Sequence, residues 1–327
     1  MNKSIIALAV AGALTAPMVA QADATLFGQI RYDITKEDST DVVSDITRIR
    51  FGVKGEETMD NGLTAGYFIR TDAAATDGSV NIHKSTVYVS GDFGKIVMGD
   101  GGNPNEGVED RTEYGLYSGT FVNMDSGFSA GGISFESADY NGLKFGVGVG
   151  NVDTSDGTSS NSFGMAVSYD ADNWGVTVGA GQSADTPAVA EYTDFVNTDG
   201  TNATTAQTHA EVAASEGDSN YGISMSGKVA AFNLGARYSV QKAKGGDDTK
   251  GYAVGGSYAV NDKLTLKLQH ESTKTSDTSM KMVAFDATYA LGGNASVTLA
   301  GISYNKNAEV AATPKKDAVK LRYNISF

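Results

Sequence analysis

The sequence predicts an all-β protein, a 16-stranded antiparallel transmembrane β-barrel, on the strength of two patterns. Segments of about ten residues alternate apolar and polar side chains over most of the chain. The links between these segments are alternately short turns and long loops. Strict alternation places two different environments on the two faces of a strand. A sheet that crosses lipid has to close on itself, because lipid cannot hydrogen-bond the groups of a free edge.

The first 22 residues have the features of a signal peptide. Lys3 gives a positive start, Ile5 to Leu14 form an apolar stretch, and Ala20-Gln21-Ala22 is a small-residue cleavage site. The apolar stretch is shorter than the roughly 20 residues that a spanning helix needs. We therefore expect residues 1–22 to be removed and residues 23–327 to form the barrel.

The composition of the expected mature chain excludes several classes of protein. Removing 22 of 327 residues leaves 305, with 24 basic and 39 acidic groups and a net charge of −15. This acidic balance argues against nucleic-acid binding, which needs clustered Lys and Arg. There are no cysteines, so packing and backbone pairing alone must stabilise the fold. In the full chain glycine is frequent, at 40 residues, and proline is scarce, at 4, which suits many paired strands.

The C-terminal segment shows the alternation most clearly. Its apolar face consists of Val319, Leu321, Tyr323, Ile325 and Phe327, and polar residues occupy every position between them. Residues 294–305 lose the alternation near Gly301, which suggests a bulge there. The expected strands are 24–35, 46–57, 62–72, 79–90, 94–99, 128–137, 141–151, 161–170, 173–183, 219–228, 231–242, 249–260, 263–274, 279–290, 294–305 and 317–327.

The longer links fall at about 36–45, 100–127, 152–160, 184–218 and 306–316, and aromatic residues cluster at the opposite, short-turn ends of the strands. This asymmetry is typical of membrane barrels with aromatic girdles. Gly146, Gly148 and Gly150 alternate with apolar residues, so they predict a strand whose inner face leaves room. A soluble β-sandwich or a β-solenoid would also alternate. However, sixteen strands are many for one sandwich, and no fixed repeat indicates a solenoid.

Five short motifs, in order along the chain, resemble the Gram-negative general porin family. They are Thr25-Leu26-Phe27-Gly28-Gln29, then Arg50-Phe51-Gly52-Val53-Lys54-Gly55, Ser90-Gly91-Asp92-Phe93-Gly94, Tyr140-Asn141-Gly142-Leu143, and the terminal Tyr323 and Phe327. The resemblance covers nearly the whole mature chain. It implies a homotrimeric barrel in the cell outer membrane of a Gram-negative bacterium, with an inward-folded third loop. It also implies a water-filled channel for passive diffusion of small hydrophilic solutes and ions.

The resemblance further implies which residues line the narrowest part of such a channel. Arg50 matches the family's basic position on the wall, and three arginines share its inward parity: Arg31, Arg48 and Arg70. The acidic candidates on the third loop are Asp100, Glu106, Glu109, Asp110 and Glu113. Any of these charges could equally do no more than solvate a wet lumen. Gln29 and His83 stand where the family often has a basic residue, so the thin basic wall and the charge of −15 predict a mild cation preference.

The resemblance also implies partners. Tyr323 and Phe327 correspond to the signal that the barrel-assembly machinery reads, and lipopolysaccharide and outer-membrane lipid would surround the barrel. We expect no cofactor, no metal site and no catalysis, because three scattered histidines form no triad or ligand pattern. Two alternatives stay open. One is a substrate-specific channel, which the few aromatic residues on the inward faces disfavour; the other is a surface adhesin or structural barrel whose long loops bind other molecules.

Overall fold

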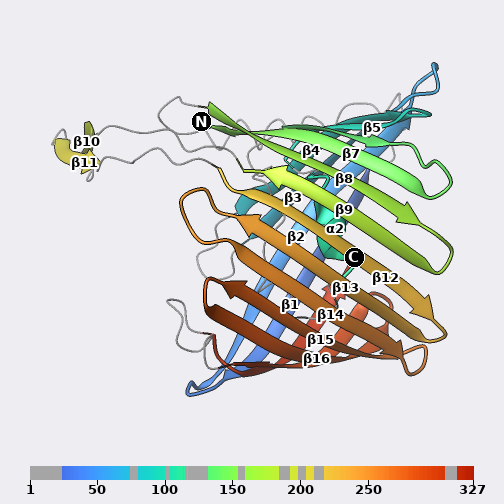
Figure 1. Cartoon of the computed structure of the whole chain (residues 1–327), viewed down its shortest axis with the longest axis vertical. Coiled ribbons are helices and arrows are strands. Elements are labelled where there is room, and N and C mark those ends of the chain that lie inside the picture. Colours follow the sequence, from blue (N-terminus) through green and yellow to red (C-terminus); the bar gives the residue numbers. More distant parts are fainter. Residues whose placement is uncertain are drawn as a thin grey trace.

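The computed structural model describes residues 24–73, 80–100, 103–112, 114, 116, 132–153, 159–183, 192–197, 204–209, 217–305 and 315–327. The expected signal peptide, residues 1–22, lies outside the described residues. Within the described ranges, sixteen strands form one closed antiparallel barrel, as the sequence predicted (Figure 1). The described part of the chain contains no helix that is both long and apolar enough to cross a membrane.

The barrel strands follow one another round the wall in chain order. They are β1 (Thr25–Glu37), β2 (Val42–Thr58), β3 (Thr64–Ala73), β4 (Val80–Gly91), β5 (Gly94–Gly99), β6 (Gly132–Ser137), β7 (Leu143–Asp153), β8 (Ser159–Asp170), β9 (Trp174–Gln182), β12 (Ser219–Val229), β13 (Phe232–Lys242), β14 (Thr249–Ala259), β15 (Leu264–Thr275), β16 (Thr278–Gly292), β17 (Ala295–Tyr304) and β18 (Ala318–Ser326). Two further elements are not strands of the barrel. They are a short helix, α2 (Glu106–Asp110), and a hairpin of β10 (Tyr192–Asn197) with β11 (Thr204–His209).

The two ends of the chain close the barrel. β1 pairs with β18 in an antiparallel register that runs from Gln29 opposite Ser326 to Glu37 opposite Ala318. The closure continues to the last residue, because Gly28 and Phe327 exchange backbone hydrogen bonds of 2.8 and 3.0 Å. A Cβ atom on Gly28 would lie 2.3 Å from the Phe327 ring, so glycine here leaves the space that this ring occupies. Closure removes every sheet edge, which a lipid environment requires.

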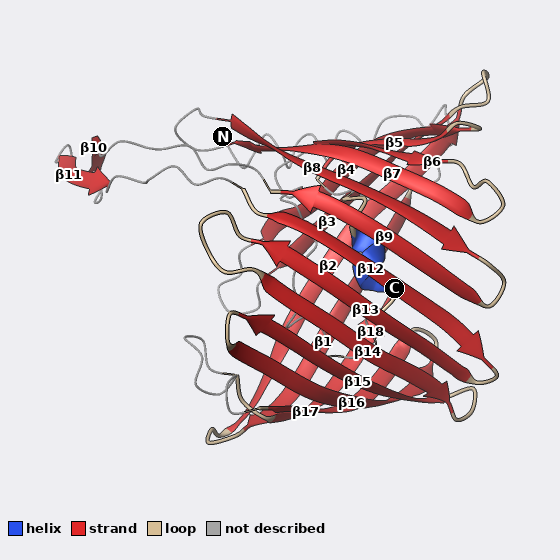
Figure 2. Cartoon of the chain, viewed as in Figure 1, coloured by secondary structure: helices blue, strands red, loops and turns tan. Residues whose placement is uncertain are grey.

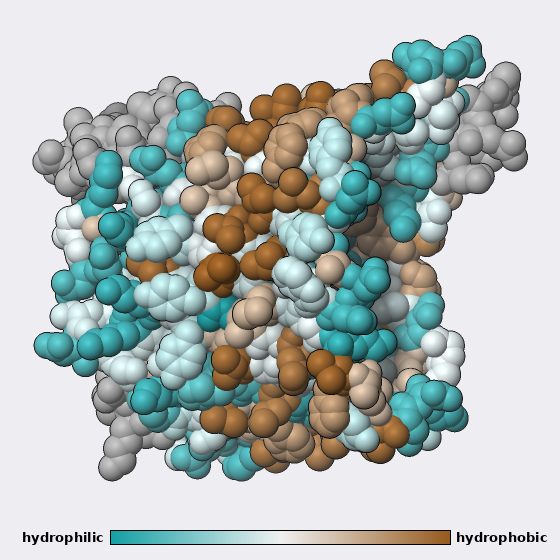
Figure 3. Space-filling view, turned by 45° about the vertical axis from the view of Figure 1, so that its right-hand side comes forward, coloured by the Kyte–Doolittle hydropathy of each residue, from teal (hydrophilic) through white to brown (hydrophobic). Residues whose placement is uncertain are grey.

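The two faces of the wall differ as the alternation predicted. Outward-facing apolar residues are exposed, for example Leu26 at 63% and Leu268 at 61%. In the space-filling view these residues form a brown band with teal, hydrophilic surface at both ends (Figure 3). Aromatic rings pair at the short-turn ends of the strands, with Tyr169 5.5 Å from Trp174 and Phe232 4.5 Å from Tyr258. An outward apolar band with aromatic rings at its border is the arrangement of transmembrane β-barrels.

Two expectations about local structure were wrong. The pairing of β16 with β17 runs unbroken past Gly301, which lies opposite Phe285, and the register shift falls instead between Ala290 and Gly292. The link over residues 184–218 was expected to be a loop, but it contains the β10–β11 hairpin. Polar residues such as Thr204–His209 carry little periodicity, so the alternation could not indicate these strands.

Candidate functional site in the barrel lumen

One side of the lumen carries a dense set of basic side chains, which we call the arginine wall. It comes from the neighbouring strands β18, β1, β2 and β3, and its members are Arg31, Arg48, Arg50, Arg70, Lys320 and Arg322. The four arginines predicted from sequence all belong to it. Cross-strand register assembles the set, because Arg31 lies opposite Arg48 on β2 and Asn324 on β18. Lys320 and Arg322 are among the polar residues that alternate with the apolar face of the C-terminal segment, but the sequence analysis did not assign them to this site.

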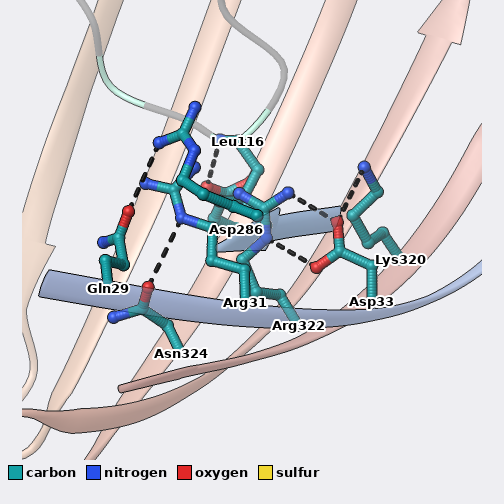
Figure 4. Close-up of polar contacts among 9 residues, drawn as sticks. Gln29, Arg31, Asp33, Leu116, Asp286, Lys320, Arg322 and Asn324 are labelled. Atoms are coloured by element: carbon teal, nitrogen blue, oxygen red, sulfur yellow. Dashed lines mark hydrogen bonds and ion pairs between the residues drawn. The ribbon is translucent and has the colours of Figure 1, made fainter. Parts of the chain in front are cut away.

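Two carboxylates are embedded in the arginine wall, and the sequence analysis assigned neither to the site. Asp33 is only 2% exposed and accepts two hydrogen bonds from Arg322, with N···O distances of 2.7 and 2.6 Å. The Nζ atom of Lys320 lies 3.4 Å from the same carboxylate (Figure 4). Asp72 accepts two hydrogen bonds of 2.7 and 2.8 Å from Arg50. These two-pronged contacts fix the guanidinium groups in place.

Arg31 and Arg48 have a different environment. Within the described part of the chain, each donates to an amide oxygen, Arg31 to Asn324 at 3.4 Å and Arg48 to Gln29 at 3.3 Å. An amide satisfies the donor but does not neutralise its charge. Four of the six basic groups of the arginine wall form ion pairs with Asp33 or Asp72, and a third carboxylate, Asp286 on β16, lies near Arg322 (Figure 4). Six basic groups against three carboxylates leave a local excess of positive charge.

Described residues of the link between β5 and β6 contact the inner wall from β9, across the lumen from the arginine wall, round to β16. Asn105 donates from its side-chain amide to the backbone oxygen of Ala180 on β9 at 3.1 Å, and Val108 of α2 is fully buried. Further along, the backbone N–H of Tyr114 donates to Gln269 at 3.1 Å, and that of Leu116 donates to Asp286 at 2.8 Å. Figure 2 shows α2 behind the strands of the wall, in the interior of the barrel.

Glycines on the inward faces make room for this segment. A Cβ atom on Gly146 would lie 3.1 Å from Pro104, and one on Gly179 would lie 2.6 Å from Asn105 and 2.9 Å from Val108. The prediction that the glycines of the 146–150 strand leave space on the inner face is thus confirmed at Gly146. Small residues on β7 and β9 give the segment a surface on which its backbone can lie close to the wall.

Arg111, which lies directly after α2, anchors the same segment. Its Nη2 atom lies 2.7 Å from the Asp170 carboxylate on β8, and its Nε atom donates to Thr177 on β9 at 2.7 Å. A Cβ on Gly175 would lie 2.2 Å from the guanidinium, so a side chain here would displace Arg111 from this position. The side chain of Arg111 is therefore held by β8 and β9, the strands against which the segment lies.

The predicted acidic residues of the third loop differ in where the structure places them. Asp100 accepts a hydrogen bond of 3.2 Å from Ser85, which pairs with the outward-facing Ile69, so Asp100 does not face the arginine wall. Asp110 lies on α2 and is exposed to the lumen. Partial desolvation by the surrounding protein raises the pKa of its carboxyl above the usual value, against an opposing effect of Lys84. Glu106 and Glu109 belong to α2, but their side chains, like all of Glu113, lie outside the described residues.

The lumen also contains aromatic side chains that the sequence analysis did not expect. Phe27, Phe68 and Tyr88 lie on the inner faces of β1, β3 and β4, on the short-turn side of the arginine wall. The alternation could have indicated Phe68 and Tyr88, because each has the parity of an inward neighbour, Arg70 or Lys84. Because these side chains are largely apolar, the sequence analysis did not distinguish them from the outward-facing apolar residues.

A closed β-barrel with an apolar outer band and a charged interior defines the class of transmembrane β-barrel channels. The chain belongs to the Gram-negative porin family, whose sequence profile matches residues 7–309. It is therefore an outer-membrane protein, as predicted.

Two relatives and several solved structures are similar to this chain. It is 32% identical over 156 residues to outer membrane porin protein 32 of Delftia acidovorans, a match to 44% of this chain and 43% of that protein. It is 32% identical over 113 residues to the major outer membrane protein P.IB of Neisseria sicca, covering 30% of this chain and 31% of that protein. The chain thus matches less than half the length of either relative.

Solved structures show the same fold over nearly the whole chain. An anion-selective porin from Comamonas acidovorans superposes with a TM-score of 0.68 at 18% identity, over 94% of this chain and 100% of that one. OmpT of Vibrio cholerae, in a trimer form, superposes with a TM-score of 0.70 at 16% identity, over the same shares. OmpF of Salmonella typhi gives a TM-score of 0.71 at 16% identity, over 94% of this chain and 98% of that one.

Proposed function

We propose that this protein forms a water-filled channel for passive diffusion of small hydrophilic solutes and ions, and that its arginine wall favours small anions. The observation that carries the proposal is the excess of basic groups in the arginine wall, six against the carboxylates of Asp33, Asp72 and the neighbouring Asp286. An ion that passes within a few ångströms experiences this charge with little screening, because the Debye length at 0.1 M salt is about 10 Å. The segment that carries α2 approaches the lumen from the opposite side, and we propose that it narrows the passage.

The proposed selectivity differs from the expected mild cation preference. That expectation used the net charge of −15 and a basic wall thought to be thin. Lys320 and Arg322 thicken the wall, and Asp100, one of the expected opposing acids, lies elsewhere. The printed description of the Comamonas acidovorans porin as anion-selective supports the same sign, as a property of that protein.

We further propose a homotrimer, by analogy with the Vibrio cholerae protein described in a trimer form. We also propose that Tyr323 and Phe327 form the assembly signal. Both side chains point outward, at 41% and 57% exposure, at the end of the strand that completes the barrel. An exposed terminal strand with outward aromatic rings is accessible to an assembly factor before the barrel closes.

Single-channel recording tests the proposed function. The refolded chain is inserted into a planar bilayer with a potassium chloride gradient across it, and the reversal potential is measured. Stepwise openings with a potential of the sign for chloride preference are expected. A potential of the opposite sign would show that the arginine wall does not control selectivity. A silent membrane with folded, inserted protein would instead favour a structural or adhesive barrel.

A further inference from the structure

A recess of about 910 Å³ opens from the lumen on the short-turn side of the arginine wall. Its walls are the inner faces of β2 to β6, and six side chains shape it: Lys54, Phe68, Arg70, Lys84, Tyr88 and Lys95. The simple diffusion of ions requires no such recess. The recess combines a flat aromatic surface with basic groups, and a ligand that is both aromatic and anionic would contact both.

Two aromatic groups lie flat along this part of the wall because glycines lie beneath them. Phe27 crosses Gly52 and stacks on Phe68, with ring centroids 5.1 Å apart and an interplanar angle of 26°. A Cβ atom on Gly52 would come within 2.5 Å of the Phe27 ring. Tyr88 in the same way crosses Gly66, where a Cβ would lie 2.2 Å from its ring. The result is a fixed apolar surface in an otherwise polar lumen.

The position of Tyr88 is fixed from both ends. Its hydroxyl donates to the Glu56 carboxylate at 2.7 Å, and the Nζ atom of Lys95 lies 4.0 Å from its ring centroid. A hydrogen bond to a carboxylate and a cation over the ring face together restrict the side chain. A preorganised aromatic surface binds a flat ligand without the loss of side-chain entropy that a mobile one would incur.

Basic groups border the aromatic surface. Arg70 and Lys84 are direct cross-strand partners on the inner faces of β3 and β4, at the side of the recess nearer the arginine wall. Lys54 is the cross-strand partner of Phe68 itself. The Nε atom of Arg70 also lies 3.6 Å from Asp72, which offsets part of its charge. Like charges directly opposite one another are destabilising, so an anion between Arg70 and Lys84 would add to the stabilisation. Four basic groups line the recess against two carboxylates, those of Glu56 and Glu136.

We propose that this recess is a binding subsite for small organic anions that carry an aromatic ring. The carboxylate lies between Arg70 and Lys84, and the ring lies on Phe68. A simple inorganic anion would use only the basic groups, and a neutral aromatic solute would use only the ring. The proposal deepens the proposed channel function and rests on it, because the ligand reaches the recess through the lumen.

The test compares three probes on the refolded full chain in planar bilayers. Sodium benzoate, sodium acetate and phenol are each added to the potassium chloride solution on both sides, and the fall in open-channel current is measured. Benzoate is expected to reduce the current at a concentration about three- to tenfold lower than acetate, the range that one aromatic contact supplies. Phenol, which lacks the charge, is expected to act more weakly than benzoate.

Two variants and a matched control locate the effect. Phe68→Leu keeps an apolar side chain but removes the ring, and it should reduce the preference for benzoate over acetate. Lys84→Gln removes one charge, and it should weaken the block by both anions. Phe51→Leu makes the same change on the lipid-facing side of β2, where Phe51 is 43% exposed, and should keep the preference. Heat-modifiable mobility on a gel confirms that each variant has folded.

Each outcome is decisive for one proposal. Equal block by benzoate and acetate in the unmodified protein would overturn the subsite and leave the channel intact. A preference that survives in folded Phe68→Leu would place the ring elsewhere and would also overturn it. A silent membrane would overturn the channel function, so the two failures are distinguishable.

Discussion

Removing the charges of Arg31 and Arg48 should reverse much of the selectivity of the lumen. These residues are cross-strand partners, and each has an amide as its described hydrogen-bond partner. Their charges therefore act on a passing ion with little neutralisation. The double change Arg31→Gln and Arg48→Gln keeps polar side chains and leaves the two Asp-centred ion pairs of the arginine wall untouched.

The size of the effect follows from Coulomb's law. An ion that passes about 6 Å from a guanidinium in water gains about 0.7 kcal/mol. Screening at 0.1 M salt reduces this to about 0.4 kcal/mol. Two such charges change anion occupancy by about fourfold and cation occupancy by about fourfold in the opposite direction. The anion-to-cation permeability ratio should therefore fall by about an order of magnitude.

The assay is the reversal potential in potassium chloride gradients centred on low and high salt. At 1 M salt the Debye length falls to about 3 Å, so the difference between variant and unmodified protein should shrink. The matched control is Lys250→Gln with Lys274→Gln. These lysines are also cross-strand partners, but they lie on the outer faces of β14 and β15, away from the lumen. The control should leave the ratio unchanged. An unchanged ratio in the arginine double variant, with normal openings, would refute the role of the arginine wall.

Three further predictions concern single residues. Asp33→Asn should lower the free energy of unfolding by about 3 kcal/mol, measured in urea, because it leaves two basic partners beside a buried neutral group; unchanged stability would show that lumen water compensates for the loss. Gly179→Leu should destabilise the protein by about 1–3 kcal/mol, because its side chain would collide with Val108; an unaltered unfolding midpoint would mean that α2 does not rest there. Because desolvation raises the pKa of Asp110, mildly acidic solution should protonate it before aspartates whose pKa is not raised, and the anion preference should increase. In Asp110→Asn that pH-dependent step should be absent from the reversal potential, and its persistence would assign it to another group.

The alternation of apolar and polar residues predicted the arginines of the site but not its aromatic surface. The inward parity of Arg48, Arg50 and Arg70 is a property of each strand alone, so the alternation indicated it. The aromatic surface of Phe68 and Tyr88 has the same parity, but an apolar residue on a wet face breaks the rule by which faces are assigned. Such exceptions concentrate at functional positions, where a local rule is broken for a purpose.

The sequence by itself determined the closed barrel, the number of strands, the division of each strand into a lipid face and a lumen face, and the family. These depend on a period of two along each strand and on the turns between strands. The tertiary structure alone decided which charges meet. Arg322 reaches Asp33 across 289 positions of sequence, through the pairing of the first strand with the last. A charge sum over the whole chain weights all residues equally, whereas an ion in the lumen responds to groups within about 10 Å, and register and closure choose those groups.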